Sequence, residues 1–248
     1  MSSYRREKPK SAAPAAQRKS AVKQPVLIRR KRMLREERER EIVSGAIKYF
    51  ADHGFHGDTR QLAEQLGITQ PLLYRYFSNK QVLIERVYKD VFLERWNPKW
   101  EEWLSDRSQP LYDRLVRFYQ DYTRRIMTHD WIRLFLLSGL DNVAINRRYL
   151  KTMHERIWSL IVDEIRFECK RPTIKIESPS ETEVELVWAV IASIFYIGVR
   201  RWVFGLGVPE DLDSVIEDKI KAFLYGAPAA MASPTGGYRP SHERMTGL

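Results

Sequence analysis

The chain has 248 residues, of which 44% are hydrophobic and 12% aromatic, so it is long enough and apolar enough to bury a substantial core. Its formal net charge is +10, and the excess lies at one end: residues 1–40 hold 14 Lys and Arg against 4 Asp and Glu, whereas the other 208 residues hold 28 of each sign. A basic end of this kind favours an anionic polymer or surface as a partner. The single cysteine, Cys169, excludes an intramolecular disulfide framework and a cysteine-based zinc site, and suits a reducing cytoplasm.

The two ends of the chain lack a regular apolar pattern. Residues 1–31 are mainly Ala, Pro, Lys, Arg and Ser, and residues 226–248 are rich in Gly, Pro and Ser. Such segments bury too little apolar surface to offset the entropy of ordering, so we expect a disordered basic arm and a disordered tail. The longest apolar run, residues 186–199, has 14 residues. Because a membrane span needs about 20 residues, a buried helix and no membrane partner are expected, and without a visible secretory signal the expected location is cytoplasmic.

Between these ends nearly every segment has the apolar spacing of a helix, which predicts an all-α fold. A first helix is expected from Arg32 to Gly54, where the glycine favours a C-terminal stop. Asp58 or Thr59 then caps a second helix, and Gly67 supplies a sharp turn after it.

A third helix follows this turn, capped by Thr69 and with Pro71 in its first turn. Ser78 and Gln81 have the spacing of a capping box, which predicts a fourth helix running to Phe92. Further helices are expected at residues 110–128, 130–138, 141–169, 180–205 and 210–225. The chain therefore divides into a three-helix unit at residues 32–78 and a larger helical domain at residues 79–225.

Residues 59–80 read TRQLAEQLGITQPLLYRYFSNK, two short helical segments joined by a glycine turn. This pattern is typical of a helix-turn-helix, whose second helix enters the major groove of double-stranded DNA. Gln70 and Tyr74 share the outer face of that helix, and a glutamine amide is able to bond an adenine edge through both its groups. Pro71 offers apolar carbons to a thymine methyl group. Hydroxyls and a cation around this face are candidate phosphate donors: Thr59, Thr69, Tyr76 and Lys80.

The segment from Ile42 to Phe92 resembles the DNA-binding domain of the tetracycline-repressor (TetR/AcrR) family. The resemblance rests on the glycine turn, on the recognition-helix motif LLYRYF and on the following Lys80, and it covers roughly a fifth of the chain. It implies base contacts from Arg60, Gln70, Pro71 and Tyr74, and phosphate contacts from Thr59, Thr69, Tyr76 and Lys80. The basic residues before the first helix depart from the family pattern, and they either add phosphate or minor-groove contacts or only solubilise the chain.

The resemblance also implies that residues 79–225 form a homodimer and bind a small-molecule effector. The segment 184–206 is apolar nearly all round, so it is either enclosed by its own domain or packed on one side against a second copy. A dimer would also read two half-sites of a palindrome. Several aromatic residues are candidates for a pocket that takes an apolar or aromatic ligand, although simple core packing explains each of them equally well: Trp100, Trp103, Phe118, Tyr122, Trp131, Trp158 and Tyr196.

We therefore interpret the chain as a ligand-responsive transcription regulator, with repression as the family's common mode. Two alternatives stay open: a sequence-nonspecific nucleic-acid-binding protein driven by the basic arm, and a helical ligand-binding protein without a DNA function. The sequence shows no phosphate-binding glycine loop and no GxSxG, HExxH or CxxC motif, so no enzyme activity, cofactor or metal is expected. His53 and His56 lie three apart, a spacing that we interpret as an ordinary loop pair.

Overall fold

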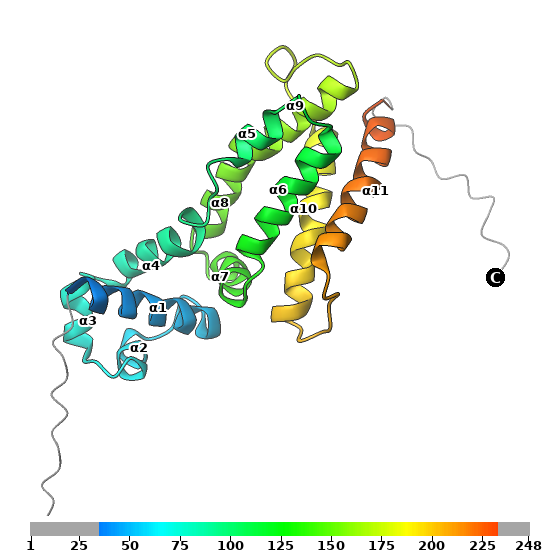
Figure 1. The fold of residues 1–248 in the computed structure, drawn as a ribbon. Helices are drawn as coiled ribbons and strands as arrows, with labels where there is room; N and C mark the ends of the chain where they lie inside the picture. Colours follow the sequence, from blue (N-terminus) through cyan, green and yellow to red (C-terminus); the bar gives the residue numbers. More distant parts are fainter. Residues whose placement is uncertain (1–34, 233–248) are drawn as a thin grey trace, which may run out of the picture. The chain divides into compact units, whose positions relative to one another are not determined.

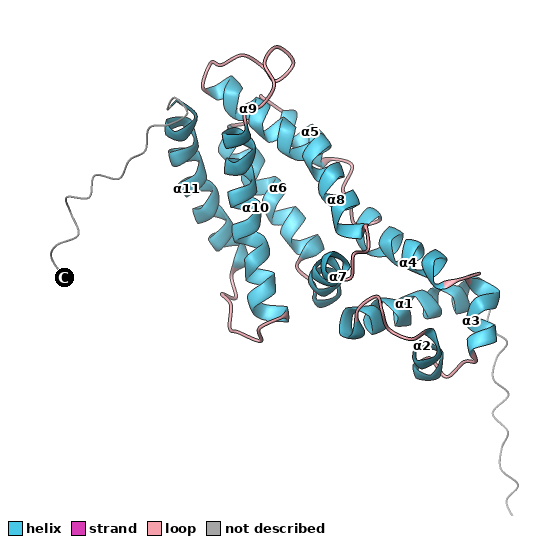
Figure 2. Cartoon of the chain, turned by 180° about the vertical axis from the view of Figure 1, so that it is seen from behind, coloured by secondary structure: helices cyan, strands magenta, loops and turns pink. Residues whose placement is uncertain are grey.

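The computed structural model describes residues 35–232, with side chains described as far as Gly226. Within this range every regular element is a helix, which confirms the predicted all-α fold (Figure 1, Figure 2). The predicted basic arm at residues 1–31, and the expected start of the first helix at Arg32, lie outside the described residues.

The first three helices form a small unit that we call the head, residues 35–79. It contains α1 (Arg35–His53), α2 (Thr59–Gln65) and α3 (Gln70–Tyr76). Gly54 follows α1 with φ of +77°, and Gly67 lies between α2 and α3 with φ of +63°. Glycine adopts these conformations without the steric penalty of a Cβ atom, so the predicted helix stop and turn are confirmed. The head encloses its own apolar side chains: Ile42, Val43, Ala46, Phe50, Leu62, Leu73 and Phe77.

A longer helix leads out of the head. It consists of α4 (Lys80–Tyr88), which continues as the π-helical segment η1 (Lys89–Leu93). Its N-cap is Asn79, whose side-chain oxygen accepts a hydrogen bond from the N–H of Val82 at 2.9 Å. The predicted capping box at Ser78 is therefore wrong by one residue, because the amide oxygen of Asn79 satisfies the free N–H instead.

The remaining helices form the body, residues 100–232. They are α5 (Trp100–Ser105), α6 (Leu111–Ile126), α7 (His129–Leu140), α8 (Ile145–Met153), the π-helical η2 (His154–Trp158), α9 (Ser159–Glu168), α10 (Glu181–Trp202) and α11 (Leu212–Ala232). The sequence pattern missed α5, which is too short to show a helical period. The helix α11 continues to Ala232, past residue 225, where the sequence pattern predicted its end, and residues 233–248 of the expected tail lie outside the described residues.

Two sets of helix contacts organise the body. The helix α6 packs against α5, α9 and α11, and Figure 1 and Figure 2 show α6, α10 and α11 side by side. The helix α7 packs against α8 and α10 on the body side and against α1 of the head. Among the larger helix contacts of the described residues, α7 is therefore the one helix that packs against both α10 and α1.

Two buried ion pairs lie within the body. The guanidinium of Arg166 and the carboxylate of Glu183 are almost fully buried, and Nη2 lies 2.6 Å from Oε2. Arg166 also donates to the backbone carbonyls of Glu177 and Ser178, so it holds the loop between α9 and α10. In the second pair, Nη1 of Arg114 on α6 lies 2.7 Å from Oε2 of Glu164 on α9.

The helix α10 is long and apolar enough to cross a membrane by length and composition, and it is the one such helix among the described residues. Helices in the cores of soluble proteins pass the same test. One face of α10 packs into the body through residues such as Val187, Ile191 and Ile194, whereas Tyr196 is 52% exposed on another face. Within a single chain, α10 is therefore only partly enclosed.

Candidate nucleic-acid interface

Local capping positions the two helices of the helix-turn-helix. At the start of α2, Oδ1 of Asp58 accepts a hydrogen bond from the N–H of Arg60 at 2.8 Å. At the start of α3, Oγ1 of Thr69 accepts from the N–H of Leu72 at 3.3 Å, and Pro71 lies in the first turn. Both caps satisfy N–H groups that a helix leaves without a partner. The predicted caps of both helices are confirmed.

Thr59 links α2 to α3 through its hydroxyl group. The side-chain amide of Gln70 donates to Oγ1 of Thr59 at 2.9 Å, and the hydroxyl of Tyr74 lies 2.9 Å from the same oxygen. Thr59 itself is only 6% exposed, whereas Tyr74 is 38% exposed. The predicted outward position of Tyr74 agrees with the structure. The hydroxyl of Thr59 faces the neighbouring helix, however, so in this arrangement it holds two predicted base-reading side chains.

The other predicted contact residues fall into two groups. Arg60, Thr69 and Pro71 are exposed. Tyr76 is half-buried and packs against the core, and Lys80 is also half-buried. These two positions leave less side chain available to a partner than the sequence pattern suggested.

Lys80 serves the loop before α2. Its Nζ donates to the backbone carbonyl of Gly57 at 2.7 Å. Burial lowers the pKa of Lys80, while the nearby carboxylates of Asp58 and Asp141 raise it. The cation thus fixes the loop that presents the N-terminus of α2.

Sequence reasoning left out one exposed cation, Arg75. It is the single basic residue of α3, and its side chain is exposed on that helix. The signal for Arg75 was available in the sequence, because a cation in the second helix of a helix-turn-helix is a candidate phosphate donor.

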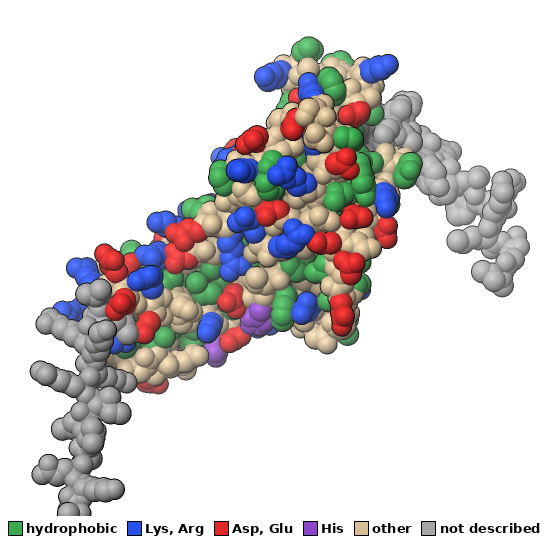
Figure 3. Space-filling view, in the orientation of Figure 1, with side chains coloured by type: hydrophobic (Ala, Val, Ile, Leu, Met, Phe, Trp, Pro, Cys, Tyr) green, Lys and Arg blue, Asp and Glu red, His purple; other side chains and the backbone are tan. Residues whose placement is uncertain are grey.

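The head has no excess of positive charge. Residues 35–79 hold 6 Lys and Arg against 7 Asp and Glu, and residues 35–232 hold 29 against 30. Figure 3 shows basic and acidic side chains interspersed over the face that it presents. In contrast, residues 1–34 hold 11 Lys and Arg against a single Glu. The excess positive charge of the chain therefore lies in the residues that precede α1 and not in the head.

A comparison with protein-family models finds one model that matches most of the head. Residues 42–87 match the model described as bacterial regulatory proteins, tetR family. Over these residues the head is therefore similar to a tetR-family DNA-binding domain. The match includes α2, α3 and most of α1 and α4, the elements that the capping and hydrogen bonds above position.

Solved structures extend the likeness to the tetR-type body. A TetR-like transcriptional regulator from Rhodococcus sp. RHA1 has a TM-score of 0.56 and 16% identity, covering 80% of this chain and 99% of that chain. A TetR family transcriptional regulator from Pseudomonas syringae pv. tomato has a TM-score of 0.51 and 16% identity, covering 76% of this chain and 95% of that chain. At these identities the likeness shows the fold. No curated protein matches the chain.

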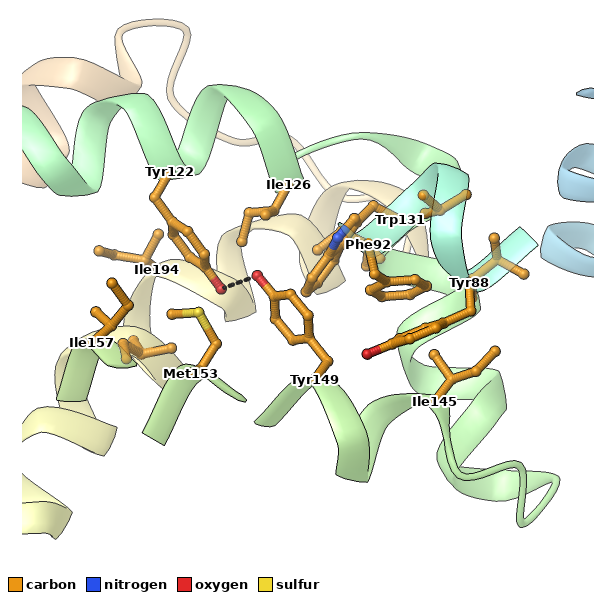
Figure 4. Close-up of a cluster of buried hydrophobic side chains, with 14 of the residues drawn as sticks. Tyr88, Phe92, Tyr122, Ile126, Trp131, Ile145, Tyr149, Met153, Ile157 and Ile194 are labelled. Atoms are coloured by element: carbon orange, nitrogen blue, oxygen red, sulfur yellow. Dashed lines mark hydrogen bonds between the residues drawn. The ribbon is translucent and has the colours of Figure 1, made fainter. Parts of the chain in front are cut away.

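The aromatic residues predicted to line an effector pocket fall in different places. Trp100, Phe118 and Tyr122 come together, with each pair of ring centroids 5.6 Å apart. Trp131 lies in a neighbouring cluster with Phe92, at 5.2 Å between centroids. The hydroxyls of Tyr122 and Tyr149 lie 3.4 Å apart and join the two clusters (Figure 4). Burial raises the pKa of Tyr122 to about 12 and raises the pKa of Tyr149 well above its ordinary value, so both hydroxyls stay protonated at neutral pH.

Three predicted pocket residues lie outside these two clusters. Trp158 contacts Trp188 at 4.3 Å between centroids, Trp103 lies under the guanidinium of Arg117, and Tyr196 is exposed. Among the described residues, the buried indole N–H groups of Trp131 and Trp158 have no hydrogen-bond partner. The described residues also contain no group of three His, Cys, Asp or Glu side chains arranged to hold a metal ion.

Proposed function

We propose that this protein is a ligand-responsive repressor of transcription that binds a palindromic operator as a homodimer and is released by a small apolar or aromatic effector. The observation that carries the proposal is the outer face of α3, where Gln70 and Tyr74 are held at the surface of a tetR-family domain by one buried hydroxyl. A side chain held in place loses less rotamer entropy when it meets a base edge.

Base reading is assigned to four side chains of α2 and α3. One amide N–H of Gln70 donates to the hydroxyl of Thr59. The side-chain carbonyl oxygen and the second N–H of Gln70 are therefore available to an adenine edge. Arg60 and Pro71 are exposed beside it, and Tyr74 presents its ring. We assign Thr59 a positioning role in place of the phosphate contact that the family resemblance implies.

Phosphate binding is assigned to the rim of α3 and to the basic arm. Thr69, Tyr76 and Lys80 remain candidates, and Arg75 joins them. Because the head carries no net positive charge, these few groups have little counterion-release affinity of their own. The residues before α1 supply the remaining phosphate contacts in this proposal.

Dimerisation is assigned to α10 and α11. Ala189, Ala192 and Tyr196 share an exposed face of α10, at positions one and two helical turns apart. Two alanines allow another helix to approach closely, and the exposed aromatic ring offers apolar surface. Two copies joined here would present two α3 helices to the half-sites of one duplex.

Effector binding is assigned to the aromatic clusters of the body. Phe92 of η1 belongs to the cluster of Trp131 and Tyr149, so a ligand among these rings would touch the helix that leads to the head (Figure 4). The free indole N–H of Trp131 would serve a hydrogen-bond acceptor on such a ligand. Release from DNA requires that the ligand prefer one arrangement of the heads over the other.

The test is selection of bound duplexes from a random pool, followed by competition against excess unrelated DNA. A regulator retains one palindromic duplex, and Gln70→Ala weakens this binding about 5- to 150-fold, about 1–3 kcal/mol for a lost base contact. Gln109→Ala, an exposed glutamine in the body, is the matched control and leaves binding unchanged. Enrichment of no sequence would support the nonspecific alternative, and the absence of any DNA binding would support a ligand-binding protein alone.

The arm is tested separately by deleting residues 1–30, which contain nine Lys and Arg. Each neutralised phosphate contributes about 0.9 to the slope of log affinity against log salt concentration. We expect the slope to fall by several units in the shortened chain. An unchanged slope would show that these residues only solubilise the protein.

A further inference from the structure

A cavity of about 480 Å³ lies at the C-terminal end of α7, and Phe135 in its wall stacks on Trp131 of the aromatic cluster at 5.1 Å between centroids. Its walls come from α7, from Asn146 in the first turn of α8 and from Val203 at the end of α10. Most of the lining is apolar, with Phe135, Leu137 and Leu140 among it. This size and composition are typical of pockets that take small organic ligands.

Two polar side chains line this cavity, Arg133 and Asn146, and each has a donor without a partner in the described part of the chain. Nε of Arg133 donates to the backbone carbonyl of Ala51, and none of the described acidic residues pairs with the rest of its guanidinium. Asn146 uses its side-chain oxygen as an acceptor for the N–H of Arg147 at 2.7 Å, and its amide nitrogen has no partner among the described residues. The lining contains no Asp or Glu. A cation and an amide N–H beside apolar walls complement an acceptor that carries negative charge.

We propose that this cavity binds a small molecule with an apolar body and a carboxylate group, and that Arg133 joins the bound carboxylate to the head. The apolar body would lie against the leucine and phenylalanine walls, and the carboxylate would take the N–H groups of Arg133 and Asn146. The link to DNA binding rests on the proposed function, whereas ligand binding in the cavity does not.

The link to the head follows from the two ends of Arg133. Its Nε holds the carbonyl of Ala51, in the last turn of α1, at 2.6 Å. The same side chain lines the cavity, and α7, which carries it, packs directly against α1. A carboxylate that draws the guanidinium into the cavity therefore changes a hydrogen bond at the end of the first head helix. By thermodynamic linkage, DNA and carboxylate must then alter each other's affinity by the same factor.

Charge argues against a second protein chain as the occupant. Leu140 is 80% exposed and Val203 is 41% exposed at this place, so a second copy would bury apolar surface here. It would also cover the guanidinium of Arg133, which needs an acidic partner when water is removed. The basic arm of this chain has the wrong sign for that role.

Calorimetric titration of the full chain tests the site, with octanoate and dodecanoate as probes, each below its micelle concentration, and 1-octanol as the uncharged match of octanoate. We expect octanoate to bind at least tenfold more tightly than 1-octanol. Arg133→Met should abolish this preference, and Arg133→Lys should retain most of it. Arg147→Met, which removes an exposed arginine from the same helical turn as Asn146, is the matched control and should leave the preference intact.

A second variant guards against misfolding of Arg133→Met. Asn146→Leu keeps the cavity apolar and removes one donor, so it should reduce the preference for octanoate over 1-octanol severalfold while circular dichroism stays unchanged. The proposal is overturned by failure of both carboxylates to bind, by equal affinity for octanoate and 1-octanol, or by an unchanged preference in folded Arg133→Met. Loss of self-association in Leu140→Ser together with absent carboxylate binding would assign the cavity to a second copy.

Operator binding with and without dodecanoate separates this proposal from the proposed function. A protein that binds no specific duplex but takes dodecanoate through Arg133 would contradict the regulator and keep the site. A protein that binds its operator but takes neither carboxylate would keep the regulator and contradict the site. If both ligands bind, we expect dodecanoate to change operator affinity about tenfold in the wild type and less than twofold in Arg133→Met.

Discussion

The head and the body use polar side chains in opposite ways. In the head, Gln70 and Tyr74 are linked to the buried hydroxyl of Thr59 by neutral, partly buried hydrogen bonds. In the body, Arg166 and Glu183 form an ion pair that is almost fully buried. A neutral hydrogen bond is exchanged easily for a contact with a base edge, since each contributes only about 1 kcal/mol. A buried ion pair is not exchanged in this way, because a charge that remains in the interior without its partner strongly destabilises the fold.

The largest effect is expected where a buried charge loses its partner. Arg166→Met removes the ion pair with Glu183 and the bonds to the carbonyls of Glu177 and Ser178. We expect the free energy of unfolding to fall by about 3–5 kcal/mol, because the buried carboxylate loses its main partner and keeps only the bonds from Ser180 and the more distant guanidinium of Arg171. Urea unfolding measures the loss. Lys175→Met, at an exposed position in the same loop, should change stability by less than about 0.5 kcal/mol.

The same ion pair should make the stability of the protein depend on pH in the acidic range. Hydrogen bonds from Arg166 lower the pKa of Glu183 to about 2, from an ordinary value of 4.5. A lowered pKa in the folded state stabilises the protein above the unfolded value, and this contribution is lost as the pH falls from about 4.5 to about 2. The contribution amounts to about 3 kcal/mol at pH 6.

Glu183→Gln tests this pH dependence. Because the glutamine does not ionise, the free energy of unfolding should fall less steeply between pH 5 and pH 2.5 than in the wild type. The two slopes should differ by the equivalent of up to one proton bound on unfolding. Equal slopes in the two proteins would mean that Glu183 has the same pKa in the folded and the unfolded state. Urea unfolding followed by circular dichroism at several pH values measures these free energies.

The junction between head and body should tolerate substitution less than the turn inside the head. A Cβ atom at Gly54 would lie 2.8 Å from Oδ2 of Asp141, an oxygen that accepts the buried N–H of Phe55. A Cβ atom at Gly67, whose φ is also positive, would meet nothing within 4 Å. Gly67→Ala should therefore lose about 1–2 kcal/mol for the left-handed backbone alone. Gly54→Ala should lose about 1 kcal/mol more, since the bond from Asp141 is disturbed as well.

A double variant isolates that extra loss. In an Asp141→Ala background the carboxylate is absent, so Gly54→Ala should lose no more than Gly67→Ala does in the wild type. If the two glycine substitutions are equal in the wild type, the contact between Asp141 and the loop after α1 contributes nothing to stability.

Predictability from sequence differed between the two regions for a physical reason. The caps at Asp58 and Thr69 and the turn at Gly67 were predictable because each depends on neighbours a few residues away in the chain. The buried ion pair between Arg166 and Glu183 was not, since helix periodicity places charged residues on solvated faces. Only the packed body shows that these two face each other.

The candidate site shows the same limit on a smaller scale. The pattern predicts correctly that Tyr74 is exposed, but it does not reveal that Thr59 and Tyr74 share a hydrogen bond across 15 residues. Likewise, aromatic composition predicts a pocket, whereas Trp100 and Phe118 contact each other and Tyr196 lies on the outside. Cavities depend on the volume that neighbouring side chains leave empty, which no local pattern records.

The smallest effect separates two roles for Thr59. Thr59→Val removes the hydroxyl that holds Gln70 and Tyr74, so operator affinity should fall about fivefold, roughly 1 kcal/mol, and Thr59→Ser should restore it. If Thr59 positions these side chains, the salt slope stays unchanged while discrimination between the operator and a substituted duplex decreases. If it contacts a phosphate instead, affinity for both duplexes falls together and their ratio stays the same, and the salt slope is again unchanged because a neutral hydroxyl neutralises no phosphate. Fluorescence anisotropy at four salt concentrations on both duplexes distinguishes these outcomes, because only a positioning role alters the ratio of the two affinities.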